Sequence, residues 1–190
     1  MNWGYLRLSE LSPGDYRDIL DSLSDSRKIH VARFQKKDDR RRSLAGEYLA
    51  RKLAAEAGVT DTRLERLTSG QPVYDRGDLY LSIAHSQDLV VCAVDTAPIG
   101  IDTEQLRPFK PGLLRHICTP EERDYVLENS PLPEDLCQDR DMIVRFFEIW
   151  TAKEAWFKKQ GTGITDLRSV NVLPLSRQIF YVGDYMIQIL

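Results

Sequence analysis

Carboxylates at two places in the chain have the types and spacing of a cation-binding site. Asp102 and Glu104 are two residues apart in the segment Gly-Ile-Asp-Thr-Glu, so both side chains point to one face if a strand continues through them. Glu154 lies within an apolar stripe of a predicted helix, where an unpaired carboxylate is costly to bury and should meet a cation. Lys158, four residues further on, is one candidate for that cation, and a metal ion is the other.

Three carboxylates form an oxygen-rich site, which suits Mg²⁺ because this ion takes a few protein carboxylates and completes its shell with water and phosphate oxygens. Zinc is not expected, because no cluster of histidine and cysteine lies nearby in the sequence. An Asp-x-Glu pair at a strand end is, taken alone, most often a solvated edge. A histidine such as His85 is more often a hydrogen-bonded surface or core residue than a ligand. The stretch 36–42 is typical of a solvated face of mixed charge.

Hydrophobic periodicity indicates the elements that position these acids. A long helix is predicted from about Asp139 to Gln160, with a stop at Gly161. Its apolar stripe consists of Ile143, Phe146, Phe147, Trp150 and Phe157. Thr119, followed by Pro-Glu-Glu, is a capping box that begins a shorter helix. Strands are predicted at 170–173 and 178–190.

The first half of the chain follows the same plan of helices followed by strands. An opening strand is predicted at 3–8. The predicted helices cover 13–22, 25–34 and 38–57, and further strands cover 79–83, 89–94 and 99–102. These alternations predict an α+β protein with an N-terminal half (1–96) and a C-terminal half (97–190), joined without a low-complexity linker.

Composition limits the class of protein. The chain has 190 residues, which allow one sizeable core and are marginal for two independent ones. The net charge of −3 does not indicate a general nucleic-acid or membrane binder, and no apolar run approaches the length of a membrane span. The start of the chain lacks the pattern of a signal peptide. The 3 cysteines form no Cys-x-x-Cys pair, so we expect a reducing, cytoplasmic environment.

Three motifs in order resemble those of the 4'-phosphopantetheinyl transferase superfamily. The segment 100–104, followed by Trp-Thr-Ala-Lys-Glu-Ala at 150–155, resembles the paired signature G-[IV]-D-x-E and W-[ST]-x-K-E-[AS] of that family. The segment 82–86 is similar to the Ser-His-Ser stretch of the monomeric, surfactin-synthetase-activating (Sfp-like) type. Residues 27–34 and 42–47 also fit the N-terminal half of that type, so the resemblance covers roughly residues 20 to 170.

The resemblance implies a fold and an activity. The family fold is a pseudo-dimer of two similar α+β halves with the coenzyme A site in the cleft between them. Its members transfer the 4'-phosphopantetheine arm of coenzyme A to a serine hydroxyl of an apo carrier protein (acyl, peptidyl or aryl), with Mg²⁺, and release adenosine 3',5'-bisphosphate. A monomer that binds coenzyme A and a carrier domain, and neither nucleic acid nor membrane, is therefore expected. The pathway would be fatty-acid, polyketide or nonribosomal-peptide biosynthesis.

The catalytic residues that the resemblance implies lie in the C-terminal half. Asp102, Glu104 and Glu154 match the acids that hold Mg²⁺ against the pyrophosphate of the coenzyme. Lys158 matches the lysine near the scissile phosphate, and we expect Glu154, or a water that it orients, to act as the base. Glu121 falls where some members have an acid near the acceptor site.

The coenzyme-binding residues that the resemblance implies lie mainly in the N-terminal half. His85 matches the histidine that contacts the 3'-phosphate of coenzyme A, and Ser86 follows it in the same motif. The remaining positions are Arg27, His30 and Ser43, where the family places basic and hydroxyl groups. A lysine is common at the position of His30.

Three departures from the family pattern support an alternative function. Gln71 replaces the positive charge of a Gly-Lys-Pro motif, Ala84 replaces a serine, and the carboxy end is expected to be short, with room for two or three strands. They leave open a non-catalytic protein of the same fold that holds coenzyme A or a carrier domain, against which the intact acid triad argues. A nucleic-acid module using Arg40, Arg41 and Arg42 lacks interleaved aromatic residues.

Overall fold

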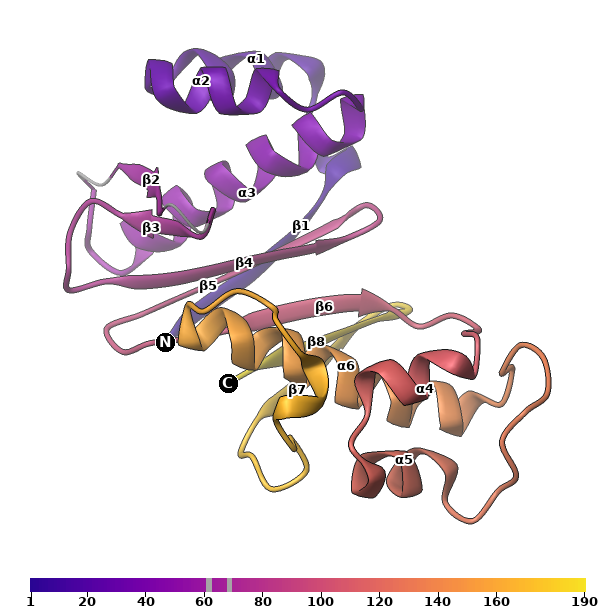
Figure 1. Ribbon diagram of the computed structural model, residues 1–190. Coiled ribbons are helices and arrows are strands. Elements are labelled where there is room, and N and C mark those ends of the chain that lie inside the picture. Colours follow the sequence, from indigo (N-terminus) through magenta and orange to yellow (C-terminus); the bar gives the residue numbers. More distant parts are fainter. Residues whose placement is uncertain (61–62, 68–69) are drawn as a thin grey trace. The chain divides into compact units, whose positions relative to one another are not determined.

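Two antiparallel sheets of three strands organise the chain (Figure 1). The computed structural model describes residues 1–60, 63–67 and 70–190, and these form two units, Met1–Ile99 and Gly100–Leu190. Each unit combines helices with one of the sheets, so the α+β class and the two similar halves are confirmed. The functional roles assigned above to halves 1–96 and 97–190 remain predictions.

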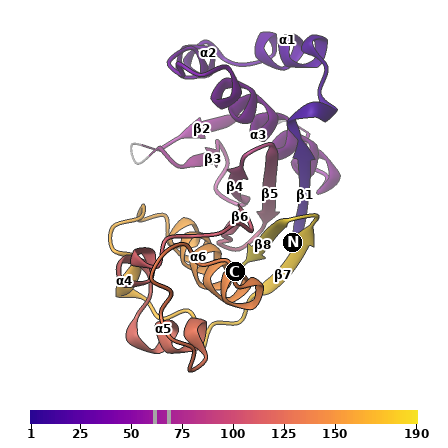
Figure 2. The same ribbon diagram turned by 90° about the vertical axis from the view of Figure 1, so that its right-hand side faces the viewer.

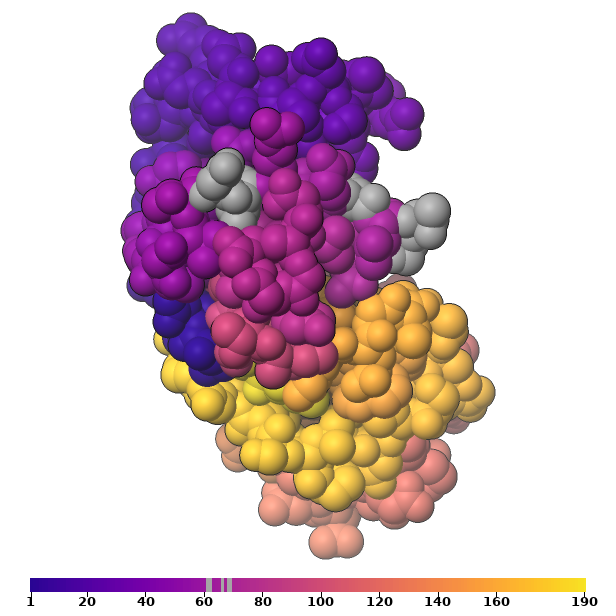
Figure 3. Space-filling model, turned by 90° about the vertical axis from the view of Figure 1, so that its left-hand side faces the viewer, coloured from indigo at the N-terminus to yellow at the C-terminus, as the bar shows by residue number. Residues whose placement is uncertain are grey.

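The sheet of the first unit has the strand order β1-β5-β4. Its strands are β1 (Asn2–Arg7), β4 (Tyr80–Ser86) and β5 (Leu89–Asp95). The helices of this unit are α1 (Pro13–Asp21), α2 (Asp25–Ala32) and α3 (Lys37–Glu56), with the 3-10 turn η1 (Leu8–Glu10). A small hairpin, β2 (Leu64–Arg66) with β3 (Pro72–Tyr74), completes it. Helices α1 and α2 both pack on α3, and in the space-filling view the indigo to purple atoms of this N-terminal part lie together (Figure 3).

Helix α3 packs on the sheet of the first unit because one of its faces is apolar and consists partly of small residues. Leu49, Ala50, Leu53 and Ala54 join one core cluster with residues of β4 and β5. The N-terminal part of α3 joins a second cluster with α1 and α2. Helix α1 begins as predicted, with a capping box between Ser12 and Asp15.

The sheet of the second unit has the strand order β6-β8-β7. Its strands are β6 (Ile101–Gln105), β7 (Gln178–Val182) and β8 (Tyr185–Ile189). The helices are α4 (Gly112–Ile117), α5 (Pro120–Leu127) and α6 (Arg140–Gln160), with the 3-10 turn η2 (Leu167–Ser169). Helix α6 packs on β6 and β8 (Figure 2). Both units therefore share one topology, in which an opening strand pairs with the second strand of a later hairpin and a long helix covers the sheet.

The predicted strand at 170–173 is wrong. The backbone of this segment forms hydrogen bonds with side chains rather than with a neighbouring strand. The Val170 carbonyl accepts from Lys153 Nζ, and the Val172 amide donates to Glu122. The predicted strand 178–190 is instead the hairpin of β7 and β8, which turns at Gly183 with a positive φ of 60°. Strands β2 and β3 and helix α4 were not predicted. No helix among the described residues is long and apolar enough to cross a bilayer.

A close approach between Gly100 and α6 fixes how the opening strand of the second unit meets its helix. A Cβ atom at Gly100 would lie 1.8 Å from the carbonyl oxygen of Ala155 and 2.9 Å from the amide nitrogen of Lys159. The Gly100 amide and carbonyl both bond to Leu190, which extends the pairing of β6 with β8. Any side chain at position 100 must therefore push the strand away from the helix.

Replacing Gly100 by alanine should destabilise the protein. Overpacking against a rigid backbone costs about 1–3 kcal/mol, and here the obstructing atom is a helix carbonyl oxygen that cannot rotate away. Urea unfolding followed by circular dichroism measures the loss. Gly112→Ala is the matched control, because a Cβ there meets no atom within 4 Å and alanine favours the helix. Equal stability of the two variants would contradict the argument.

Candidate active site

Strand β6 presents Asp102 and Glu104 to α6. Asp102 lies opposite Gln188 in the register of β6 and β8, and directly opposed residues of antiparallel strands share a face. Gln188 Nε2 donates to Thr151 Oγ1 at 2.7 Å and to the Glu148 carbonyl at 2.8 Å, so this face looks onto the helix. Glu104, two residues on, lies on the same face.

Lys158 lies between the carboxylates of the strand and the helix. Its Nζ donates to Asp102 Oδ1 at 2.5 Å and lies 3.8 Å from Glu154 Oε2. Glu154 Oε1 also accepts from Trp150 Nε1 at 3.1 Å. The structure therefore brings Asp102, Glu154 and Lys158 together, while Arg107 Nη1 lies 3.4 Å from Glu104 at the margin.

Asp102 is the most deeply buried acid of this cluster, and this corrects the expectation that Glu154 would be the buried one. The Asp102 side chain is 4% exposed, whereas the Glu154 side chain is 23% exposed. Burial raises the pKa of Asp102 to about 7; Lys158 opposes this rise, and the charges of Glu154 and Glu104 add to it. Burial alone would lower the pKa of Lys158, but the same three acids outweigh it and raise that pKa. The carboxylates of Asp102, Glu104 and Glu154 therefore all act on the ammonium of Lys158.

The donor set of this cluster fits a divalent, oxygen-seeking cation. Asp102 Oδ2 is buried and has no hydrogen-bond partner in the described part of the chain, although buried acceptors are normally satisfied. All three acids supply hard oxygen ligands, as Mg²⁺ prefers. Among the described residues no group of three His, Cys, Asp or Glu already has the geometry of a metal site. The ammonium of Lys158 supplies the positive charge there instead.

A hollow of about 270 Å³ in the first unit brings together three of the predicted coenzyme-binding residues, Arg27, Ser43 and His85. Three buried donors of its lining, Arg27 Nη1, Arg42 Nε and Ser43 Oγ, have no acceptor among the described residues. Unsatisfied buried donors are rare in folded proteins. All three groups can donate and two belong to guanidinium groups, so an anion rich in acceptor oxygens suits this hollow.

Both arginines of this hollow are already held by acids of the same helix. Arg27 pairs with Glu47 at 2.9 Å, with both side chains buried, and Arg42 pairs with Asp39 at 2.7 Å. Each guanidinium therefore offers only its remaining N–H groups. Sequence reasoning missed Arg42, because the basic stretch reads as a solvated face; its position directly before Ser43 in the matching motif was the available signal.

The structure does not bring His30 and Ser86 to this hollow. His30 lines a neighbouring hollow that shares Arg27, and its ring packs edge-on against Phe34. Ser86 is buried and belongs to the lining of neither hollow. Strand alternation is the reason, since His85 and Ser86 are consecutive residues of β4 and point to opposite faces.

A buried ion pair next to Glu154 was not anticipated. Lys153 Nζ lies 2.7 Å from Glu122 Oε2, both side chains are fully buried, and Nζ also donates to the carbonyls of Leu167 and Val170 at 2.6 Å each. Glu122 accepts in turn from the Val172 amide at 2.8 Å. Lys153, the lysine of the Trp-Thr-Ala-Lys-Glu motif, thus joins α6 to α5 and to the segment 167–170 that follows α6. Glu121, by contrast, is exposed in the first turn of α5.

Comparison with known families assigns both units to one superfamily. Residues 98–188 match the model of the 4'-phosphopantetheinyl transferase superfamily, and residues 10–97 match that of the 4'-phosphopantetheinyl transferase N-terminal region. The two matched segments meet close to the boundary between the two units.

Curated relatives of this chain are also named 4'-phosphopantetheinyl transferases. The chain is 32% identical over 166 residues to 4'-phosphopantetheinyl transferase HetI of Nostoc sp., covering 82% of this chain and 67% of the relative. It is 27% identical over 160 residues to 4'-phosphopantetheinyl transferase Sfp of Bacillus subtilis, with the same coverage. The chain belongs to the 4'-phosphopantetheinyl transferase superfamily and is an enzyme of that class.

A double-mutant cycle should show that Lys158 is coupled more strongly to Asp102 than to Glu154. We expect a coupling free energy of about 1–3 kcal/mol between Asp102→Asn and Lys158→Met, because that pair is close and shielded. The Glu154→Gln and Lys158→Met cycle should give less than about 1 kcal/mol, since that pair is longer and more exposed. Urea unfolding in EDTA measures both. Equal coupling energies would mean that Lys158 interacts no more strongly with Asp102 than with Glu154.

Proposed function

We propose that this protein transfers the 4'-phosphopantetheine arm of coenzyme A to a serine of an apo carrier protein, with Mg²⁺ as cofactor. The observation that carries the proposal is the convergence of Asp102, Glu154 and Lys158, with Glu104 on the same strand face, within the unit that matches the superfamily model. A cluster of acids around one lysine suits a polyphosphate substrate that arrives with a divalent cation.

The proposed reaction is an in-line displacement at phosphorus. The serine oxygen forms a bond to the phosphorus that carries the pantetheine arm, and the bond from that phosphorus to the bridging oxygen breaks. Adenosine 3',5'-bisphosphate leaves with the bridging oxygen. Because a serine hydroxyl is a weak nucleophile, its proton must pass to a base, and Glu154 is the proposed acceptor.

Each residue of the cluster has a proposed role. Asp102, Glu104 and Glu154 would hold the metal ion, which when bound neutralises the pyrophosphate and acts as a Lewis acid. Lys158 would donate to the phosphate oxygens on which charge develops. Its short bond to Asp102 supports this role, because the bond positions the ammonium without a ligand. The Trp150 indole would orient Glu154 through the hydrogen bond that joins them.

The hollow of the first unit is the proposed site for the 3'-phosphate of coenzyme A. Its three unsatisfied donors and the imidazole of His85 support a dianionic ligand there. We further propose that the enzyme acts as a monomer in the cytoplasm. The three cysteines, Cys92, Cys118 and Cys137, are free and buried, which accords with a reducing environment.

Transfer should require a divalent cation and the acid cluster. Mass spectrometry of several apo carrier proteins, after incubation with the enzyme, coenzyme A and Mg²⁺, should show addition of the phosphopantetheine mass. EDTA and Asp102→Ala should abolish it. Glu154→Leu should also lose transfer yet keep or raise the metal-free melting temperature, because removing a partly buried charge is often neutral or stabilising.

The matched control is Glu134→Ala, which removes an exposed carboxylate of the same unit outside the cluster and should leave transfer unchanged. Transfer at the wild-type rate by Glu154→Leu, or after exhaustive EDTA treatment, would contradict the metal assignment. A wild-type enzyme that binds coenzyme A but modifies no carrier would contradict the proposed function itself.

Loss of the hollow's donors should weaken binding of coenzyme A through its 3'-phosphate. His85→Ala and Ser43→Ala should each raise the KM for coenzyme A by about tenfold or more, since a hydrogen bond to a charged group contributes about 1.5–3 kcal/mol. The KM for 3'-dephospho-coenzyme A should change little. Ser86→Ala, on the opposite face of the same strand, is the control and should not alter the ratio of the two KM values. A ratio unaffected by His85→Ala would place the 3'-phosphate elsewhere.

A further inference from the structure

Gln188 is a fully buried polar residue in a strand that is otherwise mainly apolar. All 5 residues of β8 are buried, and Gln188 has no exposed surface. Burying an amide whose hydrogen bonds are incomplete costs about 1–3 kcal/mol, and methionine or leucine would fill the same space without this cost. Packing alone therefore does not account for a glutamine at this position.

The amide nitrogen of Gln188 is anchored to α6. Nε2 donates to the Glu148 carbonyl at 2.8 Å and to Thr151 Oγ1 at 2.7 Å, so both of its hydrogens have acceptors. A backbone carbonyl can only accept, which fixes the nitrogen end of the amide toward the helix and the oxygen end away from these partners. Oε1 is buried and has no hydrogen-bond partner in the described part of the chain.

Asp102 is the polar neighbour of Gln188 on this face of the sheet. Because β8 is the central strand, Gln188 lies opposite Asp102 of β6 and opposite Ile179 of β7. Directly opposed residues share a face, with Cβ atoms about 4.5–5.5 Å apart. Ile179 is apolar, whereas Asp102 has a buried oxygen of its own without a donor, Oδ2, while its Oδ1 accepts from Lys158.

The two buried oxygens, Gln188 Oε1 and Asp102 Oδ2, need a group that no described residue supplies. Buried acceptors are normally bonded to protein or to ordered water. A divalent cation with its waters meets both needs: Asp102 Oδ2 can bind the cation, and Gln188 Oε1 can accept from one of the waters that Mg²⁺ keeps when carboxylates bind it. Groups that bond to such waters and ligands orient a metal site and raise its affinity.

We propose that Gln188 is a positioning residue of the metal site, whose Oε1 accepts a hydrogen bond from a water of the cation beside Asp102. This inference rests on the proposed function above, which assigns Asp102, Glu104 and Glu154 to the cation. Thr151, to which Nε2 is bonded, lies three residues before Glu154 on α6. One side chain would thus hold the strand that carries Asp102 and the helix that carries Glu154 in a fixed relation to the cation.

The test is Gln188→Met, which keeps the volume of the side chain but removes both the anchor and the oxygen. Melting temperatures are measured with saturating coenzyme A and increasing Mg²⁺, without a carrier protein, so the readout does not depend on transfer. The Mg²⁺ concentration that gives half of the stabilisation should rise about tenfold or more, since loss of such a partner lowers metal affinity by about 10–100-fold. The KM for coenzyme A at saturating Mg²⁺ should stay unchanged.

Thr151→Val is the second variant, because it removes the hydroxyl that anchors Nε2 and leaves Gln188 Oε1 in the protein. The half-stabilising Mg²⁺ concentration should rise here as well, by a smaller factor than in Gln188→Met. This variant keeps the inference testable if Gln188→Met does not fold.

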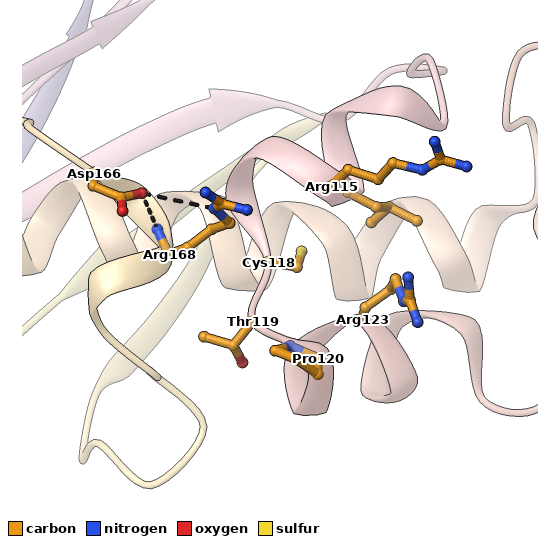
Figure 4. Close-up of a pocket in the computed structure, with 8 residues that line it drawn as sticks. Arg115, Cys118, Thr119, Pro120, Arg123, Asp166 and Arg168 are labelled. Atoms are coloured by element: carbon orange, nitrogen blue, oxygen red, sulfur yellow. Dashed lines mark hydrogen bonds and ion pairs between the residues drawn. The ribbon is translucent and has the colours of Figure 1, made fainter.

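Thr119→Ala is the control for a loss of stability alone. Thr119 Oγ1 caps α5 by accepting from the Glu122 amide at 3.3 Å, and loss of such a cap costs about 1 kcal/mol. Thr119 lines a separate hollow of about 430 Å³ with Arg115, Arg123 and Arg168, and none of the acids of the candidate active site lines that hollow (Figure 4). The variant should lower the melting temperature and leave the Mg²⁺ dependence unaltered.

The outcomes separate this inference from the proposed function. An unchanged half-stabilising Mg²⁺ concentration in Gln188→Met and Thr151→Val, or an equal rise in Thr119→Ala, would overturn the role of Gln188 and leave the proposed function intact. A wild-type protein that coenzyme A stabilises equally with and without Mg²⁺ would instead contradict the metal assignment on which the inference rests.

Discussion

The contact between Gly100 and the backbone of α6 is the constraint on which the candidate active site depends. Because no Cβ fits between Gly100 and the Ala155 carbonyl, the strand enters its sheet directly against the helix. Two residues later this proximity buries Asp102 within reach of Lys158. Gly100 and the α6 backbone at Ala155 and Lys159 are therefore the two sides of one contact, which sets how close the acids of β6 lie to the helix.

Among the described residues, each unit also has a buried ion pair that joins its long helix to a shorter one. Arg27 with Glu47 joins α2 to α3, and Glu122 with Lys153 joins α5 to α6. Apolar residues of similar volume could replace such pairs at little cost in stability, so packing alone does not account for them. Both pairs adjoin places where ligands are proposed to bind: Arg27 lines the hollow of the first unit, and Lys153 precedes Glu154.

Local signals allowed the sequence to predict most helices, whereas features that depend on distant partners were missed. The capping boxes at Ser12 and Thr119 begin helices where expected, since a cap depends on neighbouring residues alone. The segment 170–173 has the apolar composition of a strand, but Glu122 and Lys153 take its backbone bonds, and no local pattern reveals this. Helical periodicity likewise placed Glu154 among apolar residues but could not show that Lys158 lies closer to Asp102 than to Glu154.

The shared topology of the two sheets also governs the order in which their parts can assemble. In each sheet a hairpin joins neighbours in the chain, β4 with β5 and β7 with β8, whereas the opening strand must find a partner far along the sequence. Closing a short loop costs less entropy than closing a long one, so each hairpin is favoured to form first. We therefore expect β6, the edge strand that bears Asp102 and Glu104, to join its sheet after the hairpin, so that these carboxylates lose their water only when β8 and α6 are in place.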